Sequence, residues 1–249
     1  MGILVWEAGE RTQGREQMPP KSPDASDRGD ADLRRPAASP RRELARIEGE
    51  ERQRQAQLRE RIWVAMLLAC GELGYRRVTV RDVLERYGGY RAQFYRHFPN
   101  LGACYAAAYE AEAGRLCAGI LEVGASQSSW RRGLEAALSR LAAFVRDRPL
   151  AARALLIDVH IAGEPAMARR KEMFERLSRA IDSARRESES RHSSPPLTAL
   201  FMVSAIEAAV VSALLAGQPE RLEDAVPELA QMVFVAYFGD EPTGAGETG

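Results

Sequence analysis

Apolar residues recur at helical spacing along most of this 249-residue chain. Between residues 58 and 73 an apolar position returns every three or four residues, the period of a helix that buries one face. This stripe consists of Leu58, Ile62, Ala65, Met66, Ala69 and Leu73. Gly74 follows it directly and is expected to end the helix. We therefore predict a first long helix from about residue 40 to residue 73.

Short runs of Gly, Pro, Ser and Asn divide the rest of the chain into further segments with helical periodicity. The breaks fall at residues 88–89, 99–100, 126–129, 149, 163–165, 193–196 and 217–219. Alternation with a period of two, which a half-buried strand would show, is almost absent. The pattern predicts an all-α chain of about nine helices.

A short helix is predicted immediately after Thr79. Thr79 is a good N-cap, and Asp82 three residues later supplies a carboxylate version of the capping box. The apolar face that follows consists of Val80, Val83, Leu84 and Tyr87. Gly88 and Gly89 then stop this helix, because glycine tolerates the backbone conformation that ends one.

A second short helix follows the two glycines at once. Phe94 and Phe98 are four residues apart and therefore share one face of it. The other faces carry polar groups rich in hydrogen-bond donors: Arg91, Gln93, Tyr95, Arg96 and His97. Two helices joined by a tight turn, with a donor-rich second helix, are typical of a helix-turn-helix.

Residues 62–109 resemble the N-terminal domain of the TetR-like (tetracycline-repressor-like) bacterial transcription regulators. The matching residues are Gly74-Tyr75, Thr79-Val80 with Asp82, Gly88, and Phe94-Tyr95-Arg96-His97-Phe98. The resemblance implies a three-helix DNA-binding domain over residues 41–100. It also implies a helical effector-binding and dimerisation domain over residues 101–238.

Members of this family bind double-stranded DNA, and their recognition helices enter successive major grooves of a palindromic site. Arg91 and Gln93 are the expected base readers, because Arg pairs well with guanine and Gln with adenine. Contacts to the DNA backbone are expected from Thr79, Arg81, Tyr95, Arg96 and His97. The resemblance favours a repressor whose ligand weakens operator binding through the helix that starts near residue 101.

Three positions depart from the family pattern. Gly89 replaces a small aliphatic residue, Tyr90 stands where a capping residue is common, and Leu101 replaces a Lys that often meets a phosphate. These changes leave open a second function, that of a degenerate family member which binds a ligand or a protein without binding an operator.

Charge changes the picture only locally, because the whole chain carries equal numbers of acidic and basic residues. Between residues 41 and 100, 13 Arg stand against 8 Asp and Glu. This local positive excess suits a polyanionic partner. An enzyme is only the third alternative, because the sequence contains no nucleophile elbow, phosphate loop or HExxH motif that would support one. We predict no catalytic residue and no cofactor.

The three cysteines, Cys70, Cys104 and Cys117, are odd in number and form no CxxC motif. A disulfide framework or a metal site is not expected; small core residues are favoured over a redox switch. Neither a membrane span nor a signal segment is expected from the sequence, so we predict a cytoplasmic protein.

The middle of the chain, residues 130–186, predicts three helices whose apolar positions suffice either to line a cavity or to fill a core. The resemblance implies a pocket for a small apolar or amphipathic effector. His160, Asp158 and Glu164 are the polar groups best placed to meet it. The predicted ligand-binding residues are Trp130, Leu155, Val159, His160 and Phe174.

The last two helices, near residues 196–217 and 220–238, are rich in Ala, Val and Leu. By the resemblance they form an intersubunit four-helix bundle in a homodimer. One face of the first carries Phe201, Ala205, Ala208, Ser212 and Leu215.

Residues 1–40 and 239–249 are predicted to be disordered tails. Arg34, Arg35, Arg41 and Arg42 form either a DNA-contacting arm or a solvated segment.

Overall fold

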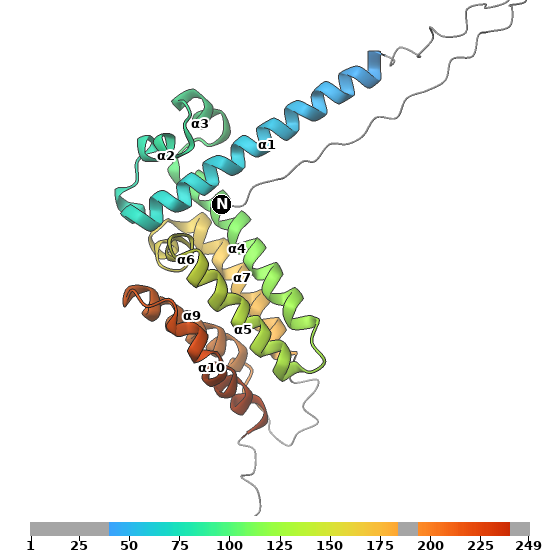
Figure 1. The fold of residues 1–249 in the computed structure, drawn as a ribbon, viewed down its shortest axis with the longest axis vertical. Helices are drawn as coiled ribbons and strands as arrows, with labels where there is room; N and C mark the ends of the chain where they lie inside the picture. Colours follow the sequence, from blue (N-terminus) through green and yellow to red (C-terminus); the bar gives the residue numbers. More distant parts are fainter. Residues whose placement is uncertain (1–39, 184–193, 240–249) are drawn as a thin grey trace, which may run out of the picture. The chain divides into compact units, whose positions relative to one another are not determined.

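The structure is a computed structural model that describes residues 40–183 and 194–239. Over these residues it contains nine α-helices and no strand, which confirms the all-α prediction (Figure 1). The α-helices are α1 (Pro40–Leu73), α2 (Val80–Tyr87), α3 (Arg91–His97), α4 (Leu101–Ala125), α5 (Trp130–Asp147), α6 (Pro149–Leu156), α7 (Glu164–Asp182), α9 (Thr198–Leu215) and α10 (Arg221–Phe238). Two 3-10 helices are η1 (Tyr75–Arg77) and η2 (Asp158–Ile161). Almost all of both predicted tails, with Arg34 and Arg35, lies outside the described residues.

The chain has two compact units, residues 1–49 and residues 50–249. The described part of the first unit is the beginning of α1, whose residues from 41 to 48 are exposed. There Glu43 and Arg46 form an ion pair one turn apart, and the guanidinium lowers the pKa of the Glu43 carboxyl. All remaining elements belong to the second unit.

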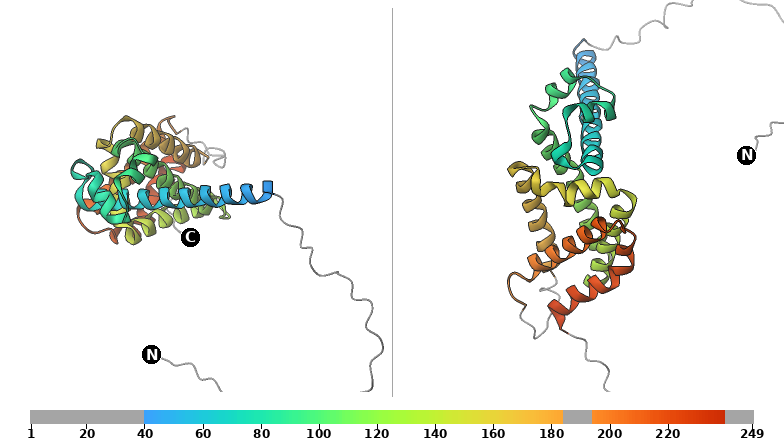
Figure 2. Two further views of the ribbon diagram at one scale, coloured as in Figure 1. Left: turned by 90° about the horizontal axis from the view of Figure 1, so that it is seen from above. Right: turned by 90° about the vertical axis from the view of Figure 1, so that its left-hand side faces the viewer.

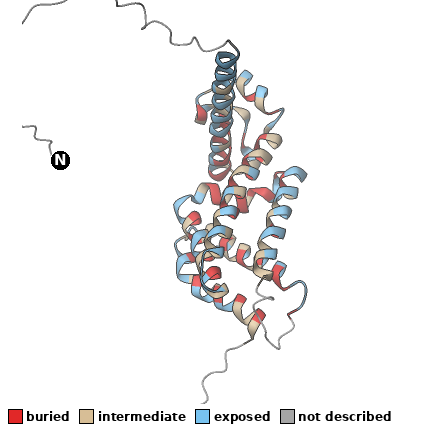
Figure 3. Ribbon diagram, turned by 90° about the vertical axis from the view of Figure 1, so that its right-hand side faces the viewer, coloured by how far each residue is buried: buried red, intermediate tan, exposed pale blue. Residues whose placement is uncertain are grey.

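The predicted apolar stripe of α1 is buried where the helix enters the second unit (Figure 3). Ile62, Met66 and Ala69 have no exposed surface. The helix ends at Leu73, as Gly74 predicted, and Gly74 has the positive φ of 78° that glycine adopts readily. Burial of this stripe, more than intrinsic helix propensity, therefore holds the C-terminal half of α1 in place.

One continuous apolar core runs from Ile62 of α1 to Tyr237 of α10. Helix α4 lies at its centre, with the rings of Tyr105 and Tyr109 almost wholly buried. Helices α5 and α7 both pack against α4, while α10 packs on α5 and α9 packs on α7 (Figure 2). Asn100 caps α4 as predicted, because its Oδ1 accepts the amide N–H of Ala103 at 2.8 Å.

All three cysteines are buried free thiols. Burial raises the pKa of each, that of Cys104 to about 12, so none is a thiolate at neutral pH. Within residues 40–183 and 194–239 no group of His, Cys, Asp and Glu side chains is arranged to hold a metal ion.

The sequence predicted no apolar run long enough to cross a membrane, and α9 differs from that expectation. It is 18 residues long with a mean hydropathy of 2.0, enough by length and composition to cross a membrane, yet only 17% of it is buried. The uncovered side chains include Phe201, with 73% of its surface exposed, and Leu215, with 62%. Residues 40–183 and 194–239 therefore leave a wide apolar face of α9 uncovered.

Candidate DNA-binding surface and effector cavity

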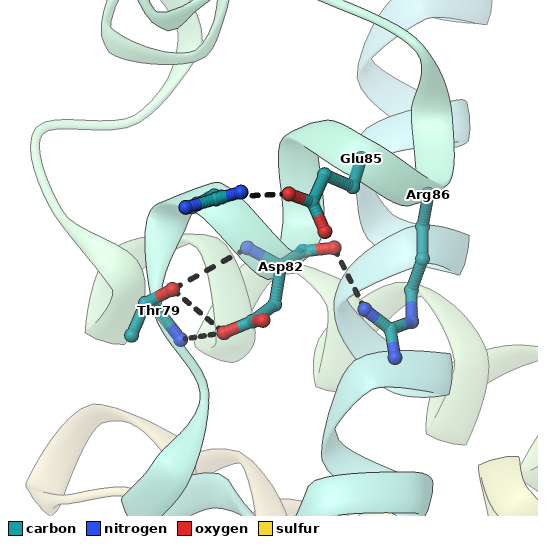
Figure 4. A network of polar contacts seen from close by, with 5 residues as sticks. Thr79, Asp82, Glu85 and Arg86 are labelled. Carbon is teal, nitrogen blue, oxygen red and sulfur yellow. Dashed lines mark hydrogen bonds and ion pairs between the residues drawn. The ribbon is translucent and has the colours of Figure 1, made fainter.

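The start of α2 is fixed by a reciprocal capping box (Figure 4). The Thr79 amide N–H donates to Asp82 Oδ2 at 2.7 Å, and the Thr79 hydroxyl donates to the same oxygen at 2.6 Å. In return the Asp82 N–H donates to Thr79 Oγ1 at 3.4 Å. The hydrogen bonds from Thr79 lower the pKa of Asp82, so the carboxylate stays ionised at the positive end of the helix dipole.

Two arginines on α2 have different surroundings. Arg81 is exposed and its Nε donates to Glu85 at 2.7 Å, so a phosphate would have to compete with this carboxylate. Arg86 donates to the Asp82 carbonyl at 2.8 Å and also pairs with Glu72 of α1. Arg86 therefore ties α2 to α1, whereas Arg81 lies at the surface and pairs within α2 itself.

The turn between α2 and α3 is built around the Tyr87 ring. Gly88 ends α2 with a left-handed φ of 71°. A Cβ on Gly89 would stand 1.9 Å from the Tyr87 ring, so any other residue here would have to displace this buried ring. The Tyr87 hydroxyl donates to the Tyr90 carbonyl at 3.3 Å and closes the turn. Gly89 thus leaves no gap, because Tyr87 fills the space that a small aliphatic side chain would occupy.

Helix α3 is anchored by Phe94 and Phe98, which are 0% and 2% exposed. Its outer face carries Arg91, Tyr95 and Arg96, all exposed, as the sequence predicted. The Arg91 guanidinium lies 5.9 Å from the centre of the Tyr95 ring, a cation–π distance. The anchored helix thus presents two cations and a phenol to solvent.

Gln93 has a role that the sequence analysis missed. Its Oε1 accepts the Tyr90 amide N–H at 3.1 Å, so this side chain caps α3 in place of a conventional N-cap residue. A side chain folded back onto its own helix end is not extended toward a base edge. Gln93 can read adenine only after leaving this cap. The signal was available, because Gln at the third helical position is the second half of a capping box.

His97 lies partly buried at the end of α3. Its Nε2 is enclosed and has no hydrogen-bond partner among the described residues. Burial, and then the positive charges of Arg59 and Arg96, lower the pKa of His97, so the imidazole is neutral at neutral pH. A neutral imidazole can contact a DNA phosphate by hydrogen bonding but not by ion pairing.

A cavity of about 580 Å³ opens among α4, α5, α7 and α9. Its wall is mostly aliphatic, and this volume is within the range of pockets that enclose small molecules. Of the five predicted ligand-binding residues, Trp130 and Phe174 line the cavity. Leu155 and Val159 are buried in the core outside its lining, and His160 is exposed to solvent. The structure thus does not bring the five together around one space.

The sequence did not predict a charged residue in the cavity wall, Glu207, or its partner Arg170. Glu207 of α9 lines the cavity and accepts hydrogen bonds from the guanidinium of Arg170 on α7, with Nε to Oε1 at 3.0 Å. Arg170 also lies 3.9 Å from the centre of the Phe174 ring. Glu207 is the one charged residue in the long apolar run of α9, and this isolation was a signal in the sequence.

No family model and no curated protein matches the chain. Solved structures do, and the chain covers nearly the whole of each. The FadR regulator from Bacillus subtilis, in complex with stearoyl-CoA, is 13% identical with a TM-score of 0.63, over 73% of this chain and 98% of that one. A TetR-family regulator from Marinobacter aquaeolei VT8 is 20% identical with a TM-score of 0.59, over 72% and 97%. A transcriptional regulator from Rhodococcus sp. Rha1 is 21% identical with a TM-score of 0.61, over 74% and 99%. The fold of this chain is therefore that of the TetR-like transcription regulators.

Proposed function

We propose that this protein is a transcription regulator, a repressor that binds a palindromic operator as a homodimer and releases it when a small effector binds. Residues 41–100 form the DNA-binding domain, and residues 101–238 hold the effector cavity and the dimer interface. The fold supports a regulator over an enzyme, because the solved structures that share it are transcription regulators. A repressor of this kind works in the cytoplasm, where its operator is.

The outer face of α3 is the observation that carries the proposal. Arg91, Tyr95 and Arg96 project from a helix that two buried phenylalanines hold in place. A recognition helix needs both exposed donors and a buried anchor, because the donors read DNA only if the helix is held in a fixed orientation. Two of the departures from the family pattern had left open a family member that binds no operator. Both fit the fold, because Gly89 makes room for Tyr87 and Leu101 packs against the core.

Selection of bound fragments from random double-stranded DNA tests this function. The parent protein should enrich a palindrome, and Arg91→Ala should weaken binding to it by about 1 to 3 kcal/mol while relaxing preference at one base pair. Tyr95→Phe should weaken all sequences alike, since a backbone contact carries no sequence information. Arg179→Ala on α7 is the matched control, because it removes the same charge from an exposed site away from α3.

Failure to enrich any sequence would leave the protein without an operator and favour a ligand-binding or interaction module. Equal losses in Arg91→Ala and Arg179→Ala would show that only overall charge matters, and the assignment of α3 would then be wrong.

A second copy of the chain is the proposed cover of α9. The exposed apolar residues of α9 and α10 lie on helices that pack against each other, and include Leu200, Phe201, Leu215 and Met232. A bilayer is the other environment for such a face. It is disfavoured because Glu207 in the same helix is ion-paired with Arg170 of α7, which would have to enter the bilayer with it.

Ala208→Arg tests the dimer, because Ala208 is exposed in one copy and the proposed bundle would bury it. A charge placed in an apolar interface without a partner is costly, so sedimentation at micromolar concentration should show monomer. Ala168→Arg is the matched control, an exposed alanine on α7. If both variants sediment as dimers, the interface lies elsewhere.

The effector is proposed to be a small apolar or amphipathic molecule. The cavity wall is mostly aliphatic, and its polar groups include Gln127, Ser128 and Ser129 of the loop between α4 and α5. A ligand with an apolar body and a polar head would match this division. Stearoyl-CoA, the ligand of the related FadR structure, is a suitable first probe.

Trp130 lines the cavity, so ligand entry should change the tryptophan fluorescence of the chain above the background of Trp6 and Trp63. Stearoyl-CoA and palmitate should each be titrated against free and operator-bound protein. If a ligand weakens DNA binding, DNA must weaken that ligand by the same factor. Ala137→Phe, which fills part of the cavity wall, should abolish the fluorescence change and leave operator binding intact. Equal ligand affinity with and without DNA would refute a ligand-operated switch.

A further inference from the structure

Helix α6 contacts both the cavity and the end of α1, and the η2 turn after it contacts η1. Leu156, the last residue of α6, lines the cavity. At the opposite end of α6, the main chain of Leu150 approaches Gly71 of α1 so closely that a Cβ on Gly71 would stand 2.3 Å from the Leu150 carbonyl oxygen. The Tyr105 hydroxyl of α4 donates to the Ala154 carbonyl at 2.6 Å and holds α6 from a third side.

Asp158, two residues beyond Leu156, joins η2 to η1, the short link between α1 and α2. Its Oδ1 accepts the amide N–H of Tyr75 at 3.1 Å, a contact between residues 83 apart in the chain. The side chain is only 4% exposed, and its Oδ2 is enclosed without a hydrogen-bond partner among the described residues.

Asp158 is unusual for a buried carboxylate, because only one of its two oxygens accepts a hydrogen bond from the described residues. Burying an ionised group costs free energy that hydrogen bonds normally offset. Burial also raises the pKa of Asp158, with the Tyr75 N–H opposing this effect. No ion pair to Asp158 occurs in the described part of the chain, and the charge of Arg153 lowers the pKa of Asp158 less than the Tyr75 N–H does. The contact with Tyr75 is therefore weakly supported by its surroundings and can open at modest cost.

We propose that Asp158 is a positioning residue that couples the effector cavity to the DNA-binding domain, with its hydrogen bond to the Tyr75 amide as the contact that opens and closes. This inference rests on the proposed function, since it assumes that the cavity and α3 communicate. Tyr75 lies two residues after the end of α1 and Thr79 caps α2 of the proposed DNA-binding pair α2 and α3, so the contact fixes the chain shortly before that pair begins.

The coupling follows from the shortness of the path. A molecule that displaces Leu156 moves the backbone two residues before Asp158, and the close approach of Leu150 to Gly71 leaves α6 little freedom to absorb this shift at its other end. The carboxylate then separates from the Tyr75 N–H, and the α2–α3 pair is released from its fixed position. Two recognition helices fit successive major grooves only at one separation, so release lowers operator affinity.

Amide hydrogen exchange of Tyr75 measures the contact directly. Selective isotope labelling of the 7 tyrosines gives few signals, among which the Tyr75 amide can be followed by NMR in the full chain. Asp158→Ala should speed its exchange at least about tenfold, because the lost hydrogen bond is to a charged acceptor. Asp158→Asn keeps an oxygen acceptor and should restore most of the protection.

Asp182→Ala is the matched control. Asp182 also accepts a hydrogen bond at 3.1 Å, from the Tyr237 hydroxyl, but it lies at the end of α7 rather than beside η1. This variant should leave Tyr75 exchange unchanged even if it destabilises the core. Thermal unfolding of all three variants separates a local opening from a global loss of stability, which would speed every core amide alike.

Operator variants with one base pair added or removed between the half-sites measure the consequence for DNA. The parent protein should discriminate against both, and Asp158→Ala should discriminate about tenfold less, in step with the opening of the contact. Unchanged Tyr75 exchange in Asp158→Ala would overturn the contact, and faster exchange with undiminished spacing discrimination would overturn the coupling. The exchange comparison needs no DNA, so it decides the contact even if the parent protein selects no operator.

Discussion

Gly71 is the position where a single methyl group should have the clearest effect on this fold. It is a helical glycine of α1 that faces the backbone at the start of α6. An alanine Cβ at this position would stand 2.3 Å from the Leu150 carbonyl oxygen and 2.7 Å from its carbonyl carbon and Cα. All three neighbours are main-chain atoms, so relief requires the two helices to separate.

Two opposing terms set the magnitude for Gly71→Ala. Replacing a mid-helix glycine by alanine stabilises a helix by about 0.5 to 1 kcal/mol. Overpacking a tight contact costs about 1 to 3 kcal/mol, and rigid backbone neighbours favour the upper part of this range. The net expectation is a destabilisation of about 1 to 2 kcal/mol, the difference of these terms.

Gly114→Ala isolates the packing term. Gly114 lies in α4, and an added Cβ there meets no atom within 4 Å, so only the gain in helix propensity remains. Urea unfolding followed by circular dichroism should show the midpoint falling for Gly71→Ala and rising for Gly114→Ala, with similar m-values. If both substitutions raise the midpoint equally, the close approach of α1 and α6 does not exist, and the path from the cavity to η1 loses its rigid end.

Three further changes test separate parts of the structure. Thr79→Ala removes the hydroxyl of the α2 cap and should lower the free energy of unfolding by about 1 kcal/mol in urea titrations; an unchanged midpoint would mean that the cap is not formed. Arg170→Met leaves Glu207 without its partner in the cavity wall and should cost about 3 kcal/mol, which Glu207→Gln in the same chain should largely restore. If the double variant is no more stable than the single one, the pair is not coupled. Asp158→Asn should raise stability at pH 7, because the raised pKa of Asp158 means that its ionised form is disfavoured in the folded state. The sign reverses the usual carboxylate case: the folded chain holds its proton more tightly than the unfolded one, so the gain should shrink as pH falls through the raised pKa of the folded state and be gone below the ordinary Asp pKa of about 4. A gain that grows toward acid pH would contradict this assignment.

Helix boundaries could be predicted from the sequence because local contacts set them. The Thr79 cap, the Asn100 cap and the stops at Gly74 and Gly88 each depend on groups within a few residues of one another. The apolar faces were predictable for a similar reason. Ile62 in α1 and Phe94 in α3 each belong to a set of apolar residues spaced at the helical period, so their burial follows from the secondary structure alone.

Gln93 shows where this local reasoning misleads. Its residue type suits an adenine edge, and the sequence places it on the helix predicted to read DNA, yet its Oε1 accepts the Tyr90 amide N–H. Both roles are consistent with the same local pattern. Only the geometry of the α2–α3 turn, in which the Tyr87 ring packs against Gly89, decides which of the two roles Gln93 has in the free protein.

The cavity shows the same division between the two levels. Periodicity established that Leu155 and Val159 face inward, but an inward side chain meets either a neighbour or an empty space, and both are apolar. The packing of α4, α5, α7 and α9 leaves the space beside Trp130 and Phe174 instead.

The contacts of Asp158 with Tyr75, and of Arg170 with Glu207, join residues 83 and 37 positions apart. The sequence by itself determined the helices, their apolar faces and the helix-turn-helix, because each follows from interactions within one or two turns. Tertiary structure alone decided which buried polar groups meet and where the core stays open, because these depend on the separations and crossing angles of whole helices, to which every side chain between them contributes.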